Sequence, residues 1–148
     1  MLLTGTHPRT LDDKNRVTLP KRVREQLGTV DQLFVTPGPD QCLWVYDQVS
    51  LEALAAKLDA APATGGDGSV FRRLFFAQME AVDLDRMGRA LIPDRLVQFA
   101  GLEKDVILIG VRDHLEVWNA RKWDEYLHQH GPRFDAVAAG AFEAKANP

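Results

Sequence analysis

The chain has little cysteine and no long apolar segment. Its 148 residues include a single cysteine, Cys42, which excludes an internal disulfide framework and a cysteine-rich zinc ribbon. No apolar run approaches the roughly 20 residues that a membrane-spanning helix needs, and residues 1–5 turn polar too soon for a secretory signal peptide. With 45% apolar residues, the composition is that of an ordinary globular protein. We therefore expect a cytoplasmic protein with no membrane partner.

Sequence patterns that are typical of enzyme sites are also missing. There is no glycine-rich phosphate loop and no nucleophile elbow. The adjacent carboxylates of Asp12 and Asp13 lack the apolar pocket that separates the pKa values of an acid/base pair. His114, His128 and His130 suggest a metal site, but no third ligand has a convincing spacing. We expect no enzymatic activity, no cofactor, no metal and no small-molecule substrate.

Basic residues are concentrated at the N-terminal end of an otherwise acidic chain. The net charge is −3, yet residues 1–28 contain six basic and three acidic residues and so carry +3. The remaining 120 residues therefore carry −6. A local basic segment can attract an anionic partner even when the mean charge is negative. The six basic residues are Arg9, Lys14, Arg16, Lys21, Arg22 and Arg24.

The sequence contains an internal repeat with an offset of 73 residues. Residues 11–28 and 84–101 are identical at six of eighteen positions. After a shift of one residue, the match continues between residues 43–47 and 115–119. Polar residues match as well as apolar ones, which argues against chance similarity of two amphipathic stretches. The identical pairs are Leu11 and Leu84, Asp12 and Asp85, Arg16 and Arg89, Pro20 and Pro93, Arg22 and Arg95, and Gly28 and Gly101.

Each copy predicts a hairpin followed by a short helix. Residues 12–15 are typical of a turn, because an aspartate side chain can accept hydrogen bonds from the nearby backbone and asparagine tolerates a positive φ. In the second copy Gly88 takes the place of Asn15 and also suits a positive φ. The alternating residues 16–19 predict a strand. Pro20 fits the first position of a helix that Gly28 would end. The corresponding residues of the second copy predict the same elements.

Two more strands and a longer helix complete each copy. Asp47 and Asn119 are suitable N-caps for helices that follow the last strand. Such small units bury little apolar area alone, so we expect the two copies to exchange strands and pack into a pseudo-symmetric barrel. The predicted strand pairs are 32–36 with 42–46 and 105–109 with 114–118.

The segment between the copies is predicted to be a linker, because residues 60–68 are rich in Ala, Pro and Gly. Ser69 is a suitable cap for a helix that follows it. Residues 134–142 have a helical pattern, and residues 143–148 are typical of a frayed tail. The domain boundaries that we expect are 1–62 for the first repeat, 63–79 for linker and helix, and 80–148 for the second repeat with a C-terminal helix.

The repeated pattern resembles the MraZ family of bacterial proteins. The resemblance extends from Gly5 to about Phe142 and rests on the two Asp-x-x-x-Arg motifs, residues 3–7 (LTGTH) and residues 113–118 (DHLEVW). It implies an α+β fold, namely a pseudo-two-fold, duplicated AbrB-like swapped-hairpin β-barrel with peripheral helices. It also implies a DNA-binding transcriptional regulator that forms a ring oligomer, associates with the nucleoid and binds no cofactor. The DNA sites would be short direct repeats upstream of the division and cell-wall gene cluster.

The resemblance places the DNA contact at the hairpins. A β-ribbon can enter the major groove of double-stranded DNA, where arginine can bond to guanine, whereas lysine more often contacts phosphates. The motif maps onto Asp12, Lys14 and Arg16 in the first copy and onto Asp85 and Arg89 in the second. The two aspartates are expected to fix the hairpin turns. The residues that we expect to bind DNA are Lys14, Arg16, Arg9, Lys21, Arg22, Arg86 and Arg89.

We expect the first hairpin to make the dominant DNA contact. Met87 stands in the second copy where the first has Lys14, and Asp94 stands where the first has Lys21. Three acidic residues, Glu80, Asp83 and Asp94, would then surround the second motif. The second hairpin would be an auxiliary or structural site.

Two other classes of function fit the sequence less well. An AbrB-like module can bind protein as an antidote to a toxin partner, but such antidotes usually have one hairpin copy and a disordered tail. This chain has two copies and almost no tail. A small hydrolase would need an assembled site, which the sequence does not indicate.

Overall fold

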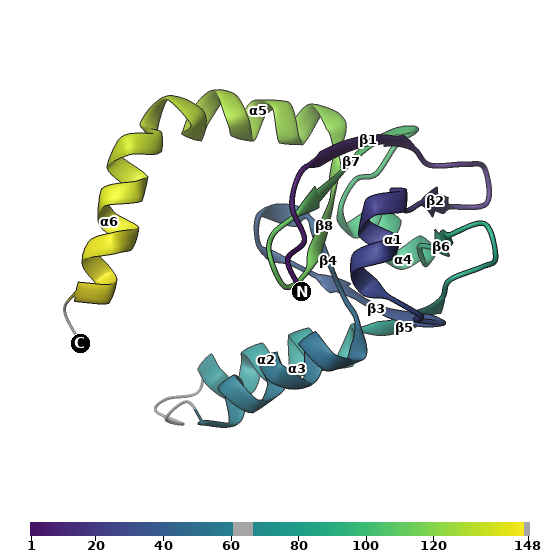
Figure 1. Cartoon of the computed structure of the whole chain (residues 1–148), viewed down its shortest axis with the longest axis horizontal. Helices are drawn as coiled ribbons and strands as arrows, with labels where there is room; N and C mark the ends of the chain where they lie inside the picture. The colour runs from purple at the N-terminus through teal and green to yellow at the C-terminus, as the bar shows by residue number, and fades with distance from the viewer. Residues whose placement is uncertain (61–66, 147–148) are drawn as a thin grey trace.

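The computed structural model of the chain describes residues 1–60 and 67–146, so most of the predicted linker lies outside the described residues. The fold is α+β, as predicted: a six-stranded antiparallel sheet, a two-stranded sheet, and helices around them (Figure 1). The strands are β1 (Thr6–Thr10), β2 (Arg16–Thr18), β3 (Gln32–Pro37), β4 (Leu43–Tyr46), β5 (Glu80–Asp83), β6 (Arg89–Leu91), β7 (Asp105–Gly110) and β8 (Leu115–Asn119). The helices are α1 (Lys21–Leu27), η1 (Pro39–Gln41), α2 (Gln48–Ala60), α3 (Asp67–Ala77), α4 (Asp94–Phe99), α5 (Ala120–His130), η2 (Gly131–Arg133) and α6 (Phe134–Ala146).

Each sheet contains strands from both repeats. The order of the larger sheet is β1-β7-β8-β4-β3-β5, so β1 of the first repeat pairs with β7 of the second. At the other edge, β5 of the second repeat pairs with β3 of the first. The small sheet joins β2 to β6, with Val17 opposite Ala90. Each repeat therefore contributes strands that are hydrogen-bonded to the other.

The core lies between the sheets and the two short helices. Its largest buried side chains include Leu33, Leu43 and Leu108 from the six-stranded sheet. Val23 anchors α1 and Leu96 anchors α4 in the same core. Burying an aliphatic side chain of this size contributes about 1.5–3 kcal/mol. Helices of seven and six residues are too short to be stable alone, so this packing holds them in place.

The turn residues adopt the conformations that the sequence predicts. Asn15 has φ +59° and Gly88 has φ +75°, which confirms a left-handed residue in both hairpin turns. Gly28, with φ +73°, ends α1 as predicted. The prediction for Pro20 is wrong by one position, because α1 begins at the following residue. The ψ of Pro20 is 143°, an extended value that places it just outside the helix as the N-cap.

The predicted helix caps at Asp47 and Asn119 are confirmed. Asp47 Oδ1 accepts a hydrogen bond from the backbone N–H of Ser50, and Asn119 Oδ1 accepts one from that of Arg121. The cap predicted at Ser69 is wrong, because α3 begins two residues earlier, at an aspartate whose charge favours a helix N-terminus.

Two helical arms project from the sheets. In Figure 1, α2 and α3 lie side by side, and α5 leads to α6, which lies apart from the sheet.

The predicted helix over 134–142 is confirmed, but the predicted tail is wrong for residues 143–146, which continue α6. Glu, Ala and Lys in this segment are strong helix formers. Residues 147–148 lie outside the described residues. Within the described ranges, no helix is both long enough and apolar enough to cross a membrane.

Candidate nucleic-acid interface

The first hairpin turn is organised by the carboxylate of Asp12. Its Oδ1 accepts hydrogen bonds from the backbone N–H groups of Lys14 (3.0 Å) and Arg16 (2.8 Å). Its Oδ2 accepts a hydrogen bond from Nε of Arg16 at 2.7 Å. The backbone N–H of Arg16 is the main cause that holds the pKa of Asp12 below its usual value. One ionised side chain therefore fixes both the turn and the arginine beside it.

The second hairpin repeats this geometry. Asp85 Oδ1 accepts from the backbone N–H groups of Met87 and Arg89, each at 2.9 Å. Asp85 Oδ2 accepts from Nε of Arg89 at 2.8 Å. The backbone N–H of Arg89 is likewise the main cause of a lowered pKa at Asp85. The Asp-x-x-x-Arg spacing thus places the same ion pair in both turns.

The two arginines keep the outer edge of the guanidinium group available. In the described parts of the chain, the side-chain hydrogen bonds of Arg16 and Arg89 run through Nε alone. Their side chains are 28% and 27% exposed. The terminal nitrogens can donate to two acceptors in one plane, a geometry that suits guanine or a phosphate.

The two turns lie at the same end of the molecule (Figure 1). The pairing of β2 with β6 brings them together, and two backbone bonds of 2.8 Å join each hairpin to the other. Leu19 N donates to Gly88 O, and Ile92 N donates to Asn15 O. We call the exposed ends of residues 12–16 and 85–89 the hairpin surface.

Each hairpin turn lies beside the helix that follows the other hairpin, which is the reverse of what the sequence predicts. Asp94 was expected beside the second motif, but it accepts a hydrogen bond from Nδ2 of Asn15, at the first hairpin, over 2.6 Å. Arg24 of α1 lies against Gly88 of the second hairpin. Because β2 and β6 are antiparallel, the end of each strand lies beside the turn of the other hairpin. The helix that follows each strand therefore reaches the opposite turn.

The remaining basic residues differ in their surroundings. Arg9 is half-buried and donates from Nε to the carbonyl oxygen of Thr18 (3.2 Å) and from Nη1 to that of Pro8 (2.7 Å). The bond to Thr18 holds β1 against β2, and the two bonds together leave less of Arg9 available to a partner. Four further residues of the expected set are exposed: Lys14, Lys21, Arg22 and Arg86.

A single buried histidine, His114, lies between two carboxylates, away from the hairpin surface. His114 Nδ1 lies 2.8 Å from Asp113 Oδ1, and its Nε2 lies 3.2 Å from Glu116 Oε2. Burial lowers the pKa of His114, but hydrogen bonds to Glu116 and Asp113 outweigh burial and raise it overall. Among the described residues, no three His, Cys, Asp or Glu side chains gather as a metal site.

The chain matches a known family over nearly its whole length. The family model described as "MraZ protein, putative antitoxin-like" matches residues 2–73 and 75–144, one segment for each repeat. The chain belongs to the MraZ family. This membership confirms the resemblance that the two motifs indicated.

Relatives in the MraZ family share more than a third of their residues with this chain. A protein of Acetivibrio thermocellus is 40% identical over 134 residues, covering 90% of this chain and 92% of the relative. A protein of Clostridium beijerinckii is 38% identical over 137 residues, covering 93% and 94%. One of Moorella thermoacetica is 36% identical over 137 residues, with the same coverage. All three are named "Transcriptional regulator MraZ".

Proposed function

We propose that this MraZ family member is a transcriptional regulator that binds double-stranded DNA through the hairpin surface. The observation that carries this proposal is the paired geometry of Arg16 and Arg89. Both are held by an aspartate, both keep their terminal nitrogens available, and both lie at one end of the molecule. The names of the relatives support the same function.

Different residues of the hairpin surface would contact different parts of the DNA. Arg16, preset by Asp12, would donate to guanine O6 and N7 in the major groove. Lys14 is exposed beside it and would contact a phosphate, giving affinity without sequence information. Arg86 and Arg89 would contact the same duplex from the second turn. Arg9 would contribute mainly by positioning β1.

We also propose that the fold is a duplicated swapped-hairpin barrel with repeats at residues 1–62 and 80–148. The exchange of β1 and β5 between the repeats supports it. So do the matching ion pairs, which are offset by 73 residues.

A ring oligomer would present many hairpin surfaces to one duplex. Two exposed apolar faces support self-association. On α6, Phe134, Val137 and Phe142 are 72%, 49% and 72% exposed, and on α3, Phe71 and Leu74 are 45% and 56% exposed. Large exposed apolar faces usually mark an interface between proteins.

In such a ring, weak contacts to successive direct repeats would add through effective concentration. The expected location is the nucleoid, at repeats upstream of the division and cell-wall gene cluster.

The test is a titration of the purified protein with the DNA that lies upstream of its own gene. We expect binding that falls steeply between about 50 and 200 mM salt, because phosphate contacts release counterions. A scrambled duplex should bind more weakly. If neither duplex is bound at low salt, DNA binding is wrong and the protein-binding, antidote-type alternative gains support.

A further inference from the structure

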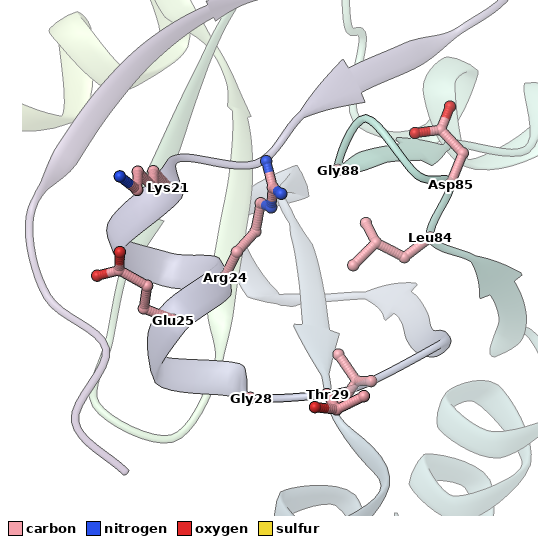
Figure 2. Close-up of a pocket in the computed structure, with 9 residues that line it drawn as sticks. Lys21, Arg24, Glu25, Gly28, Thr29, Leu84, Asp85 and Gly88 are labelled. Atoms are coloured by element: carbon pink, nitrogen blue, oxygen red, sulfur yellow. The ribbon is translucent and has the colours of Figure 1, made fainter.

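A groove separates α1 from the second hairpin. It has a volume of about 430 Å³, with α1 on one side and residues 84–88 on the other (Figure 2). Two basic residues of α1, Lys21 and Arg24, line it. We call it the α1 groove. Asp85 and Gly88 of the second hairpin turn also line it, so a duplex on the hairpin surface would pass close to it.

Arg24 lies directly over the turn of the second hairpin. A Cβ added to Gly88 would lie 2.6 Å from both Cδ and Nη1 of Arg24, so only glycine permits this approach. Figure 2 shows the Arg24 side chain extending from α1 towards this turn. In the described part of the chain, its guanidinium group has no hydrogen bond or ion pair. An arginine with five unused donors matches the oxygens of a phosphate.

The formal charges of the groove lining balance, but one of its two carboxylates is already paired with Arg89 of the second hairpin. Asp85 lines the groove, but its carboxylate is already bonded to Arg89 and to two backbone N–H groups. Glu25 is the other carboxylate of the lining, against the charges of Lys21 and Arg24. The groove therefore keeps a net attraction for an anion.

The equivalent groove beside the first hairpin has the opposite character. It measures about 490 Å³, and Val97 occupies the place that corresponds to Arg24. Three carboxylates line it, those of Asp12, Asp13 and Glu103, against one basic residue, Lys104, and Asp94 lies nearby at Asn15. The two grooves are related by the repeat, but only the α1 groove has a free guanidinium group. The second hairpin has Met87 where the first has Lys14, and Lys21 and Arg24 of α1 lie beside it in space.

We propose that Arg24 binds a backbone phosphate of DNA in the α1 groove, beside the second hairpin. This inference rests on the proposed DNA-binding function and extends it. It makes the second hairpin a DNA-contacting element, with a phosphate contact that the first hairpin does not have. Lys21, one turn earlier on α1, adds long-range attraction.

The first test compares Arg24→Gln with Lys57→Gln, which removes the same charge from α2, away from the hairpins. For Arg24→Gln we expect about tenfold weaker binding, the usual size of one charged hydrogen bond. The loss should be equal for the specific and scrambled duplexes. The slope of log K against log salt should fall by about one for each protomer engaged. Lys57→Gln should bind as the unaltered protein does, and Arg24→Lys should recover part of the affinity.

The second test displaces Arg24 without changing its charge. Gly88→Asn keeps a residue that tolerates positive φ, as Asn15 does at the equivalent position, but its side chain occupies the space of Arg24. We expect the same loss as for Arg24→Gln and no further loss in the double variant. Thermal melting and native mass would show that both variants fold and assemble.

Three results would overturn the proposal. If both variants bind as tightly as the unaltered protein, the DNA-binding function stands and Arg24 has no role in it. A loss confined to the specific duplex would mean that Arg24 reads a base instead of a phosphate. If the unaltered protein binds no DNA at low salt, the proposed function fails and the phosphate site fails with it.

Discussion

Asn15 of the first hairpin donates a hydrogen bond to Asp94 of α4, the helix of the second repeat, over 2.6 Å. A turn from one repeat is therefore fixed by a helix from the other. The contact also sets a carboxylate beside the hairpin that carries Lys14 and Arg16. An acidic residue at this place weakens the attraction of the first hairpin for phosphates.

Asp94→Asn should strengthen DNA binding. The amide keeps an oxygen that can accept from Asn15 but removes the negative charge. We expect affinity to rise about two- to fivefold at low salt and the gain to shrink at high salt, because the Coulombic effect is screened. A titration at two salt concentrations measures this. The matched control is Asp67→Asn on α3, which should change little; weaker binding by Asp94→Asn would contradict the prediction.

Arg16→Ala should remove sequence preference. Without the guanidinium group, the specific duplex should bind no better than a scrambled one. The oligomer should remain intact, since an ion pair this exposed contributes little to stability. A mobility-shift assay with native mass measurement checks both points. Normal discrimination between the duplexes would show that Arg16 does not read the sequence.

Arg89→Ala should weaken binding less than Arg16→Ala does. Met87 stands where the first turn has Lys14, so the second turn lacks the lysine that would contact a phosphate beside its arginine, and its other cation, Arg86, stands at the position of Asp13. The same mobility-shift assay compares the two variants at one salt concentration. Equal losses would mean that the two hairpins contribute alike, with Arg24 compensating fully for the missing lysine.

The stability of the fold should depend on His114 in a defined range of pH. Its pKa is raised above the ordinary value of 6.5, so its contribution is complete below that pH and is lost as pH rises through the raised value. Burial raises the pKa values of Asp113 and Glu116, but hydrogen bonds from His114 outweigh it and lower both. Their contribution is present above their ordinary values and is lost only in acid. His114→Gln should therefore destabilise most near pH 5.5 and less above about pH 8, as urea denaturation at both pH values would show. An equal loss at both would exclude the charged histidine as the cause.

Assembly should depend on the apolar face of α6. Phe142→Asp places a charge on a side chain that is 72% exposed, so the single chain should still fold. If this face joins protomers, native mass should fall to that of smaller species, and binding to several DNA repeats should lose its cooperativity. Glu143→Ala, at the neighbouring residue, is the control. An unchanged mass for Phe142→Asp would place the interface elsewhere.

The hairpin turns, helix caps and helix ends can be predicted from the sequence because each depends on residues that are neighbours in the chain. The turn at Asn15, the cap at Asn119 and the end of α1 at Gly28 each depend on one residue and its immediate neighbours. The repeat offset also relates Asp12 to Asp85, and the two ion pairs match. These features needed no knowledge of which strands pair.

The residues that lie beside each hairpin turn could not be predicted from the sequence. An offset of 73 residues identifies equivalent positions but does not say which repeat each one contacts. Asp94 was therefore expected beside the second motif, whereas strand pairing carries it to Asn15 of the first hairpin, and the same pairing carries Arg24 to Gly88 of the second. A glycine in the second turn was one available signal, because its missing side chain leaves room for a neighbour.

The three residue pairs that join β2 to β6 have a mechanical consequence. They set a fixed span between the two turns, so neither can swing independently to follow an irregular double helix. When both touch the same target, the nucleic acid must supply the bending. Flexible base steps between the contacted positions would then be favoured, and selectivity would extend to nucleotides that no side chain reaches.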